Sequence, residues 1–285
     1  MAEPGRGGEL LSGARGNRVL VKDILIRAGV DDVARTAADI IGSYVKDGAV
    51  IGLATGSTPL ATYRELIARQ EAGALDFSGC TAFCLDEYLG LPPEHVQSYH
   101  HTIRTEFTSH INIADRNVHS PDAMDPRPWE AAQRYEQAIA DAGGIDVQLL
   151  GVGTNGHIGF NEPASALNAL TRVETLHPQT VVDNARFFDS PDEVPTHAIT
   201  QGLGTILRSG HALLLATGAG KADAVAKMVE GPLSASCPAS VLQLHRHATI
   251  IVDEAAAAGL KDAEYYRHMD AARPEWMGVD GRPRA

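Results

Sequence analysis

The segment AVIGLATGSTPLATYREL, residues 49–66, joins a short apolar run to a turn that contains Gly56 and to a helical pattern that begins at Pro59. A continuous apolar run is typical of a strand that is buried on both faces, as in a parallel sheet. Proline suits the first turn of a helix because it lacks the N–H group that would have no partner there. The segment therefore predicts a strand, a tight turn and a helix, the repeating unit of an α/β fold.

The same alternation continues along the chain. Further strands are expected at residues 18–21, 82–85, 147–151, 212–216 and 249–252. Helical patterns lie at residues 31–46, 98–109, 128–142, 198–208 and 221–229. Apolar strands separated by helices favour parallel pairing with helices on both faces of the sheet. We expect a three-layer α/β/α sandwich with a mostly parallel, Rossmann-like open sheet.

The domain organisation is expected to be simple. Residues 1–17 are rich in glycine and charge and are interpreted as a flexible leader. No shift in composition divides residues 18–270, which we interpret as a single catalytic α/β domain. Residues 271–285 contain little apolar material and are expected to form a C-terminal tail on the surface.

Composition excludes several classes of function. The 285 residues include 24 Lys and Arg against 36 Asp and Glu, and this net charge of −12 would repel a phosphate backbone, so nucleic acid is not an expected partner. No apolar stretch is long enough for an export signal or a membrane span. The three cysteines, Cys80, Cys84 and Cys237, do not form a disulfide framework. We therefore expect a cytoplasmic protein without a membrane partner.

The turn that follows the first quoted strand is a candidate anion site. A glycine turn before a helix presents backbone N–H groups and the positive end of the helix dipole, and two hydroxyl groups add donors. The candidate residues are Thr55, Gly56, Ser57 and Thr58. A plainly capped helix start would give the same pattern, so both interpretations stay open. A nucleotide P-loop is excluded because no GxxxxGK[ST] pattern occurs at this turn.

Two polar segments follow other predicted strands. In FCLDEYLGLP, residues 83–92, Asp86 and Glu87 end an apolar run, where one carboxylate can act as a general base or merely cap a turn. In LLGVGTNGHIGFNEP, residues 149–163, glycines surround Asn155, His157 and Glu162. The second segment favours an acid–base site over a structural histidine. Its final Glu-Pro step would break the helix that a dinucleotide loop requires.

Basic residues supply possible phosphate ligands. Lys221 ends TGAGK, residues 217–221, a second glycine turn that echoes the first, and Arg172 and Arg186 are further candidates. Each of these residues taken alone could equally be a solvated surface cation. The histidines lack the spacing of zinc ligands, so we assign no metal.

Together these segments resemble the glucosamine-6-phosphate deaminase family over almost the whole chain. The matching segments are LATGSTPLATYREL (53–66), LDEYLGLPPEHVQSYH (85–100), GVGTNGHIGFNEPAS (151–165), ARFFD (185–189), TGAGKADAVAKMVEGP (217–232) and SVLQLH (240–245). The related 6-phosphogluconolactonases typically have DGH followed by T-A-S in the third segment. The NGHIGFNEP of this chain therefore favours the deaminase.

The resemblance implies conversion of glucosamine 6-phosphate to fructose 6-phosphate and ammonia in amino-sugar catabolism, without a cofactor or metal. It implies that Asp86 moves the C2 proton to C1 and that His157 opens the sugar ring. Glu162 would orient His157. The substrate phosphate would be bound by the turn at residues 55–58 with Arg186 and Lys221.

The chain departs from some members of that family at two places. Asn155 stands where they have an aspartate, so we expect Asn155 to position its neighbours without carrying charge. Ser165 and Arg172 match an allosteric phosphosugar site, but Glu174 replaces its lysine, and a carboxylate would repel phosphate. Activation by N-acetylglucosamine 6-phosphate is therefore not expected. Residues 177–195 resemble the family's active-site lid.

Other functions stay open. The substrate could be another hexosamine phosphate, such as galactosamine 6-phosphate, and a 6-phosphogluconolactonase-like hydrolase is a further alternative. A sugar-phosphate sensor is least favoured, because residues 1–17 leave no room for a DNA-binding module ahead of the first strand. The sequence does not decide whether the protein forms a homo-oligomer.

Overall fold

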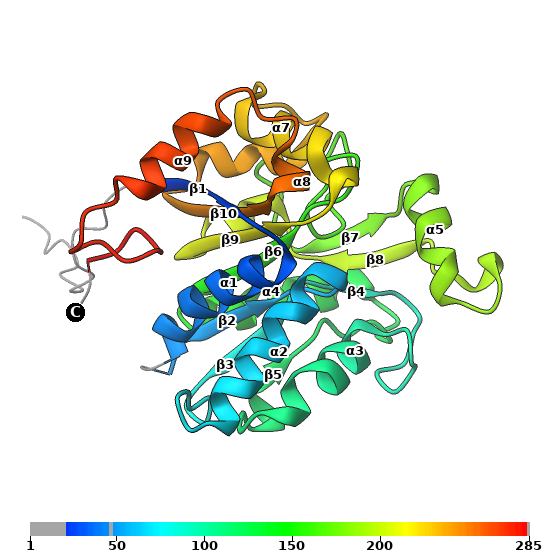
Figure 1. Ribbon diagram of the computed structural model, residues 1–285. Helices are drawn as coiled ribbons and strands as arrows, with labels where there is room; N and C mark the ends of the chain where they lie inside the picture. The colour runs from blue at the N-terminus through cyan, green and yellow to red at the C-terminus, as the bar shows by residue number, and fades with distance from the viewer. Residues whose placement is uncertain (1–20, 46–47, 284–285) are drawn as a thin grey trace, which may run out of the picture.

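A central parallel sheet organises the protein, whose computed structural model describes residues 21–45 and 48–283. Seven strands lie in the order β1-β10-β9-β6-β2-β3-β5, and all neighbours in this sheet are parallel (Figure 1). The strands are β1 (Val21–Arg27), β2 (Val50–Leu53), β3 (Thr81–Cys84), β5 (Val118–His119), β6 (Val147–Gly151), β9 (His211–Ala216) and β10 (His247–Asp253). The leader predicted at residues 1–17 lies outside the described residues.

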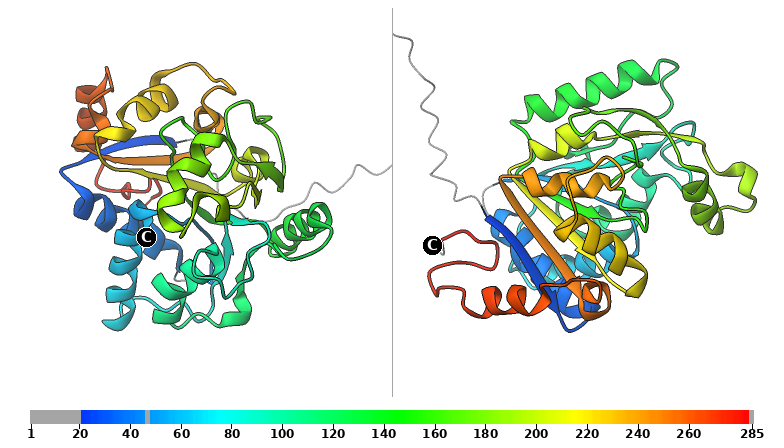
Figure 2. Two further views of the ribbon diagram at one scale, coloured as in Figure 1. Left: turned by 90° about the vertical axis from the view of Figure 1, so that its right-hand side faces the viewer. Right: turned by 90° about the horizontal axis from the view of Figure 1, so that it is seen from above.

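Helices cover both faces of this sheet, as the further views show (Figure 2). One face carries α1 (Val30–Val45), α2 (Ser57–Glu71) and α3 (Tyr99–Glu106). The other carries α4 (Pro128–Asp141), α6 (Leu203–Leu207), α7 (Ala222–Glu230) and α8 (Glu254–Ala257). Helix α9 (Ala263–Ala271) packs along β1. The expected three-layer sandwich is confirmed.

Alternation of side chains along the strands explains the two cores. In β6, Leu149 points into the core beneath α1 and α2, and the adjacent Leu150 points into the core beneath α7. Leu213 and Leu214 of β9 divide in the same way. Because neighbouring side chains of a strand face opposite sides of the sheet, a strand covered on both sides must be apolar throughout. This is why the apolar runs predicted the central strands well.

A second, antiparallel sheet was not expected from the sequence. It has the order β4-β8-β7, formed by β4 (Asp86–Tyr88), β8 (His197–Thr200) and β7 (Arg172–Thr175). A single residue, Leu85, separates β3 from β4, so the small sheet continues from the carboxyl end of the large one. The helix α5 (Pro178–Asn184) follows β7 and stands out from the body of the protein (Figure 1).

Two predicted elements are wrong in part. The strand predicted at residues 18–21 is β1, Val21–Arg27, and residues 18–20 lie outside the described part of the chain. The apolar pattern underestimated this strand because Asp23 interrupts it. The carboxylate of Asp23 lies 3.3 Å from the guanidinium of Arg273, a residue far along the chain that the local pattern does not reveal. The helix predicted at residues 198–208 begins only at Leu203, because His197–Thr200 pair with β4 and β7 instead.

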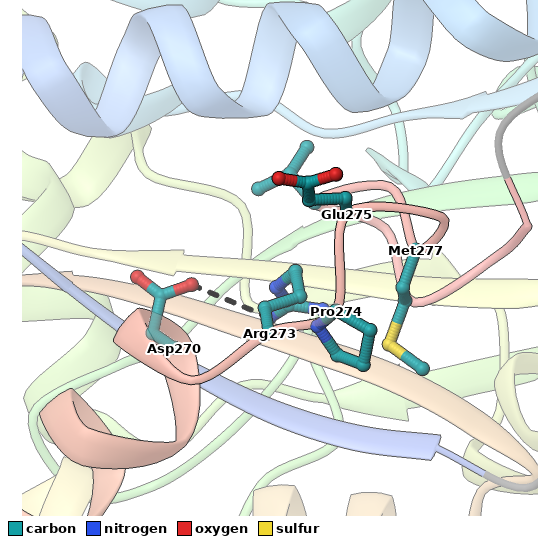
Figure 3. A pocket seen from close by; sticks show the side chains of 6 residues that line it. Asp270, Arg273, Pro274, Glu275 and Met277 are labelled. Carbon is teal, nitrogen blue, oxygen red and sulfur yellow. Dashed lines mark hydrogen bonds and ion pairs between the residues drawn. The ribbon is translucent and has the colours of Figure 1, made fainter.

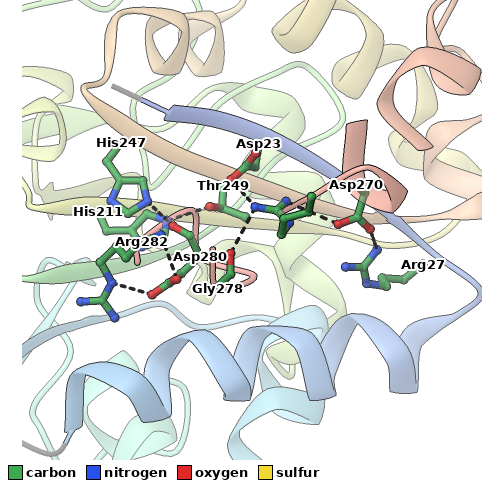
Figure 4. A network of polar contacts seen from close by, with 10 residues as sticks. Asp23, Arg27, His211, His247, Thr249, Asp270, Gly278, Asp280 and Arg282 are labelled. Atoms are coloured by element: carbon green, nitrogen blue, oxygen red, sulfur yellow. Dashed lines mark hydrogen bonds and ion pairs between the residues drawn. The ribbon is translucent and has the colours of Figure 1, made fainter. Parts of the chain in front are cut away.

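The C-terminal segment, predicted as a surface tail, is largely exposed but is fastened to the rest of the protein at several points. Residues 273–283 lie against the amino ends of β1, β9 and β10, where Arg273 bonds to Asp23 and the Asp280 carbonyl lies 2.6 Å from Nε2 of His247 (Figure 4). Asp280 is only 6% exposed, and the Arg282 guanidinium lies over the ring of Tyr44. A pocket lined in part by Asp270 and Arg273 lies beside this segment (Figure 3).

None of the helices among the described residues is long and apolar enough to cross a bilayer.

The buried His245 makes folding sensitive to acid. Its Nδ1 accepts the His247 N–H at 3.0 Å, and burial lowers its pKa from 6.5 to about 4. The unfolded chain therefore binds a proton at His245 more readily than the folded protein does. The free energy of unfolding is unaffected by His245 above pH 6.5 and decreases as the pH falls from 6.5 toward 4. We expect His245 to account for a loss of about 2 kcal/mol between pH 7 and pH 5.

His245→Asn tests this expectation, because its carboxamide oxygen can still accept the His247 N–H. Urea denaturation at pH 7 and pH 5 should show a smaller loss of stability for this variant than for the unsubstituted protein. His268→Asn, at an exposed position of α9, serves as the control and should keep the full pH dependence. An equal loss for His245→Asn and the unsubstituted protein would contradict the assignment.

Candidate active site

The two glycine turns lie side by side at the carboxyl edge of the large sheet. Gly56, with φ 113°, precedes α2 after β2, and Gly218, with φ 87°, precedes a short 3-10 helix, η5 (Ala219–Lys221), after β9. The hydroxyls of Thr58 and Thr217 approach to 3.2 Å. The two similar glycine turns of the sequence are therefore neighbours in the structure. Helix α2 begins at Ser57, two residues before the predicted start, and Gly56 has no side chain that could cap its N–H groups.

The second turn is partly occupied by a carboxylate that sequence reasoning missed. Asp253, at the end of β10, accepts the Gly218 N–H on both oxygens at 3.0 Å and caps α8 through Ala256. A strand that ends in aspartate before a run of alanines is a helix-cap signal, and this signal could have identified it. Because its first N–H is taken, the Gly218 turn offers fewer donors to an anion than the Gly56 turn.

The two basic candidates lie in different places. Lys221 ends η5, and its N–H bonds to the Gly218 carbonyl, so it stands directly beside the turns. Arg186 belongs to η3 (Ala185–Phe187) after α5, is exposed, and stacks its guanidinium 4.7 Å from the centre of the Phe187 ring. The structure thus joins Lys221 to the turns and places Arg186 on a separate, outlying element.

The adjacent carboxylates Asp86 and Glu87 have separate roles. Glu87 accepts the N–H groups of Tyr88, Tyr99 and His100 at 2.8 to 2.9 Å, and so fastens the start of α3 to β4. Asp86 faces the opposite way, toward Gly159. Burial, followed by the charge of Glu87, raises the pKa of Asp86 well above its usual value. A buried carboxylate with a raised pKa is suited to accept a proton from carbon.

Gly159 brings the NGHIGF loop against Asp86. Its φ is 56°, and a Cβ there would lie 2.8 Å from Thr200 Oγ1 and 3.3 Å from Asp86 Oδ2. No larger residue fits without moving one of these groups. The absence of a side chain at Gly159 therefore lets the loop that carries His157 pack directly against the buried Asp86.

His157, Glu162 and Asn155 form one polar cluster, which we call the His157–Glu162 pair with its Asn155 bridge. Nδ1 of His157 lies 3.5 Å from Glu162 Oε2. Asn155 donates to the same oxygen at 3.0 Å and accepts the His157 N–H on Oδ1 at 3.1 Å. The ring has room because Gly153 lacks a Cβ, which would lie 2.2 Å from Cε1. Asn155 thus fixes both members of the pair.

Glu162 is a charged acceptor despite its burial. Burial alone would raise its pKa, but the contacts with His157, Thr180 and Asn155 outweigh that effect and lower the pKa to about 2. Thr180, on α5, donates its hydroxyl to Oε1. Sequence reasoning missed Thr180, because nothing in the local pattern indicates which residue of a helix reaches a loop in another part of the chain.

A neighbouring cluster joins the three residues that the sequence analysis grouped as an allosteric remnant. Arg172 donates to Ser165 Oγ at 3.0 Å and forms an ion pair with Glu174. It also donates to Asn161 Oδ1 at 2.8 Å. Asn161, which was not a candidate, is fully buried and connects this cluster to the NGHIGF loop. The Arg172 guanidinium is therefore already occupied by a carboxylate.

Among the described residues, no three His, Cys, Asp or Glu side chains gather as a set that could hold a metal ion.

Comparison with known proteins identifies the family. A family model described as "Glucosamine-6-phosphate isomerases/6-phosphogluconolactonase" matches residues 21–251. The chain is 65% identical over 255 residues to a glucosamine-6-phosphate deaminase of Corynebacterium urealyticum, covering 90% of this chain and 99% of the relative. It is 56% identical over 256 residues to one from Rhodococcus jostii, with the same coverage of 90% and 99%.

Solved structures agree with this result. One described as a monomeric glucosamine-6-phosphate deaminase is 40% identical, with a TM-score of 0.81 over 83% of this chain and 99% of its own. The 6-phosphogluconolactonase from Trypanosoma cruzi is 20% identical, with a TM-score of 0.67 over 87% of this chain and 100% of its own, which shows a shared fold. The chain belongs to the family of glucosamine-6-phosphate isomerases and 6-phosphogluconolactonases.

Proposed function

We propose that this protein is a glucosamine-6-phosphate deaminase, which converts glucosamine 6-phosphate and water to fructose 6-phosphate and ammonia in amino-sugar catabolism. The observation that carries the proposal is the junction at Gly159, where the loop of the His157–Glu162 pair meets the buried Asp86. Relatives with 56% to 65% identity bear the same name. The mechanism below follows from the chemistry of these side chains.

Ring opening is the first step. His157 accepts the proton of the O1 hydroxyl and returns a proton to the ring oxygen, which breaks the bond between C1 and that oxygen. Glu162, with its low pKa, stays ionised and favours a proton on Nδ1 of His157, so that Nε2 faces the substrate. Asn155 holds both residues in place and carries no charge itself.

Proton transfer from C2 to C1 is the second step. Asp86 removes the C2 proton and delivers it to C1, while O1 takes up the proton that the C2 amine gives up, so the aldehyde becomes an alcohol and the amine becomes an imine. Water then adds to the imine, and ammonia leaves as the C2 ketone forms. The raised pKa of Asp86, caused by burial and by the charge of Glu87, supports this role, because it makes the carboxylate a stronger base. Since water is consumed, the enzyme is a hydrolase.

The substrate phosphate is proposed to bind at the Gly56 turn. Thr55, Gly56, Ser57 and Thr58 supply backbone and hydroxyl donors at the start of α2, and Lys221 supplies a positive charge beside them. The exposed Arg186 is proposed to close over the phosphate from the lid, residues 177–195. The position of Asp253 at the second turn supports the Gly56 turn as the main anion site.

Several further expectations stay predictions. A cytoplasmic location is supported by the three free, buried cysteines, which a reducing compartment keeps as thiols. The phosphosugar substrate follows from the proposed activity. A homo-oligomer stays open, since the relative described as monomeric shows that the family does not require one.

The activity is tested with purified protein and glucosamine 6-phosphate. Ammonia and fructose 6-phosphate should form in equal amounts. Galactosamine 6-phosphate and 6-phosphogluconolactone serve as the competing substrates, and turnover of either one alone would transfer the assignment to that substrate. Binding of glucosamine 6-phosphate without turnover of any of the three would support a sensor and contradict the proposal.

Asp86→Asn tests the proton-transfer step. The amide cannot accept the C2 proton, so turnover should fall by about 10²–10⁴-fold, the usual contribution of a positioned base. Exchange of C2 deuterium with solvent, followed by NMR, should be lost to the same extent. Calorimetric binding of fructose 6-phosphate should change little. Asp39→Asn, at an exposed position of α1, is the matched control, and unchanged exchange in Asp86→Asn would remove Asp86 from this role.

Regulation is predicted to be absent, because the ion pair with Glu174 occupies Arg172 and places a carboxylate where a phosphate would bind. Rate against glucosamine 6-phosphate concentration should follow a hyperbola, and N-acetylglucosamine 6-phosphate should not change it. Glu174→Lys is the informative variant, because it restores the residue that the resemblance expects. A sigmoidal curve that the effector relieves in the unsubstituted protein would show this prediction to be wrong.

A further inference from the structure

The helix α5 reaches the acid–base cluster through a buried hydroxyl. Thr180 is 6% exposed and donates to Glu162 Oε1 at 2.5 Å. The other oxygen of Glu162, Oε2, is held by Asn155 at 3.0 Å and faces His157 at 3.5 Å. The carboxylate is therefore held from two separate elements, the loop after β6 and the lid helix.

We propose that Thr180 is a positioning residue, whose hydroxyl couples the closed position of α5 to the ionised, correctly oriented Glu162. The inference rests on the proposed function, because it gives the His157–Glu162 pair its role in ring opening. It adds that the pair is complete only when α5 is closed.

The chemistry of the contact makes this coupling reciprocal. A hydroxyl donates more strongly to an ionised carboxylate than to a neutral carboxylic acid. The closed position of α5 therefore favours ionised Glu162, and ionised Glu162 favours the closed position to the same extent. When α5 is displaced, Glu162 keeps only the partners of its own loop. His157 then loses part of the orientation that its catalytic tautomer needs, because Glu162 is held from one side only.

A second contact from the same face of α5 gives the helix a defined closed position. Asn184, four residues after Thr180, donates to the Tyr88 hydroxyl at 2.7 Å. Tyr88 lies in β4, two residues after Asp86, and its ring makes an edge contact with Phe188 at 6.0 Å between centroids. Residues four apart share one helix face, so α5 is fastened at both ends to elements that carry catalytic groups. Val182, between them, is 65% exposed.

The titratable surroundings of Glu162 are well defined. His157 is the titratable group that faces it from the NGHIGF loop, and Asn155 and Thr180 are the polar donors from the loop and from α5. Arg172 does not contact Glu162 directly. It donates to Asn161, the residue that precedes Glu162, and forms an ion pair with Glu174. Loss of the Thr180 hydroxyl should therefore raise the pKa of Glu162 toward that of an ordinary glutamate.

Thr180→Val and Thr180→Ser form the test. Valine keeps the shape of threonine and removes the donor, whereas serine keeps the donor. Loss of a hydrogen bond to a charged group predicts a kcat about 10-fold lower for Thr180→Val, with KM changed by less than about 3-fold. The acid limb of its kcat profile should move toward higher pH, because Glu162 without this donor is protonated more readily. Thr180→Ser should stay within about 3-fold of the unsubstituted enzyme in kcat. Val182→Thr, on the exposed face, is the control.

A second measurement does not need the substrate. Hydrogen exchange of residues 178–184 in the unliganded protein should be faster in Thr180→Val than in Thr180→Ser or Val182→Thr, because the helix loses its contact with Glu162. This separates the two ideas. An unsubstituted protein that does not deaminate glucosamine 6-phosphate contradicts the proposed function, while the exchange result still decides whether the hydroxyl holds α5.

Two outcomes would overturn the inference in an active enzyme. An unchanged pH profile and kcat in Thr180→Val would show that the hydroxyl does not act on the pair. Equal impairment of Thr180→Ser and Thr180→Val would show that the packing of the methyl group, and not the hydrogen bond, is what matters.

Discussion

All parallel strands of the large sheet end at one edge, and this constraint gathers the candidate site. The turn after β2 carries Gly56, the turn after β9 carries Gly218, and the loop after β6 carries His157. Asp86 follows β3 by two residues. Segments that are distant in sequence meet there because the carboxyl ends of parallel strands lie at the same edge of a sheet. The small antiparallel sheet then closes over the same edge and adds the elements that bury Asp86.

Two carboxylates at this edge are driven in opposite directions by their surroundings. Asp86 is buried beside another carboxylate, so the neutral form is favoured and its pKa rises. Glu162 is also buried, but three donors converge on it and keep it ionised. Side chains of nearly identical chemistry thus become a proton acceptor and a fixed negative charge. Burial is the larger cause of the raised pKa of Asp86, and the neighbouring Glu87, which accepts backbone N–H groups of α3 and β4, adds to it.

The sequence predicts what is local and misses what is distant. The central strands and the glycine turns were predictable, because burial on both faces imposes apolar runs and tight turns impose glycine. The small sheet was not, since β8 is short and is stabilised by pairing with β4 and β7. Thr180 and Asp253 act on residues 18 and 35 positions away. Their roles follow from three-dimensional proximity, which no short pattern contains.

The C-terminal segment also affects whether the edge of the large sheet can pair with a strand of another molecule. A parallel sheet has two edge strands, whose free backbone groups can pair with another chain. One edge of this sheet is β5, only two residues long. The other is β1, and the ion pairs of Asp23 with Arg273 and of Arg27 with Asp270 fasten α9 and the following segment to it. Charged side chains and a helix packed along an edge strand disfavour its addition to a neighbour's sheet, so the end of the chain helps to protect its beginning from aggregation.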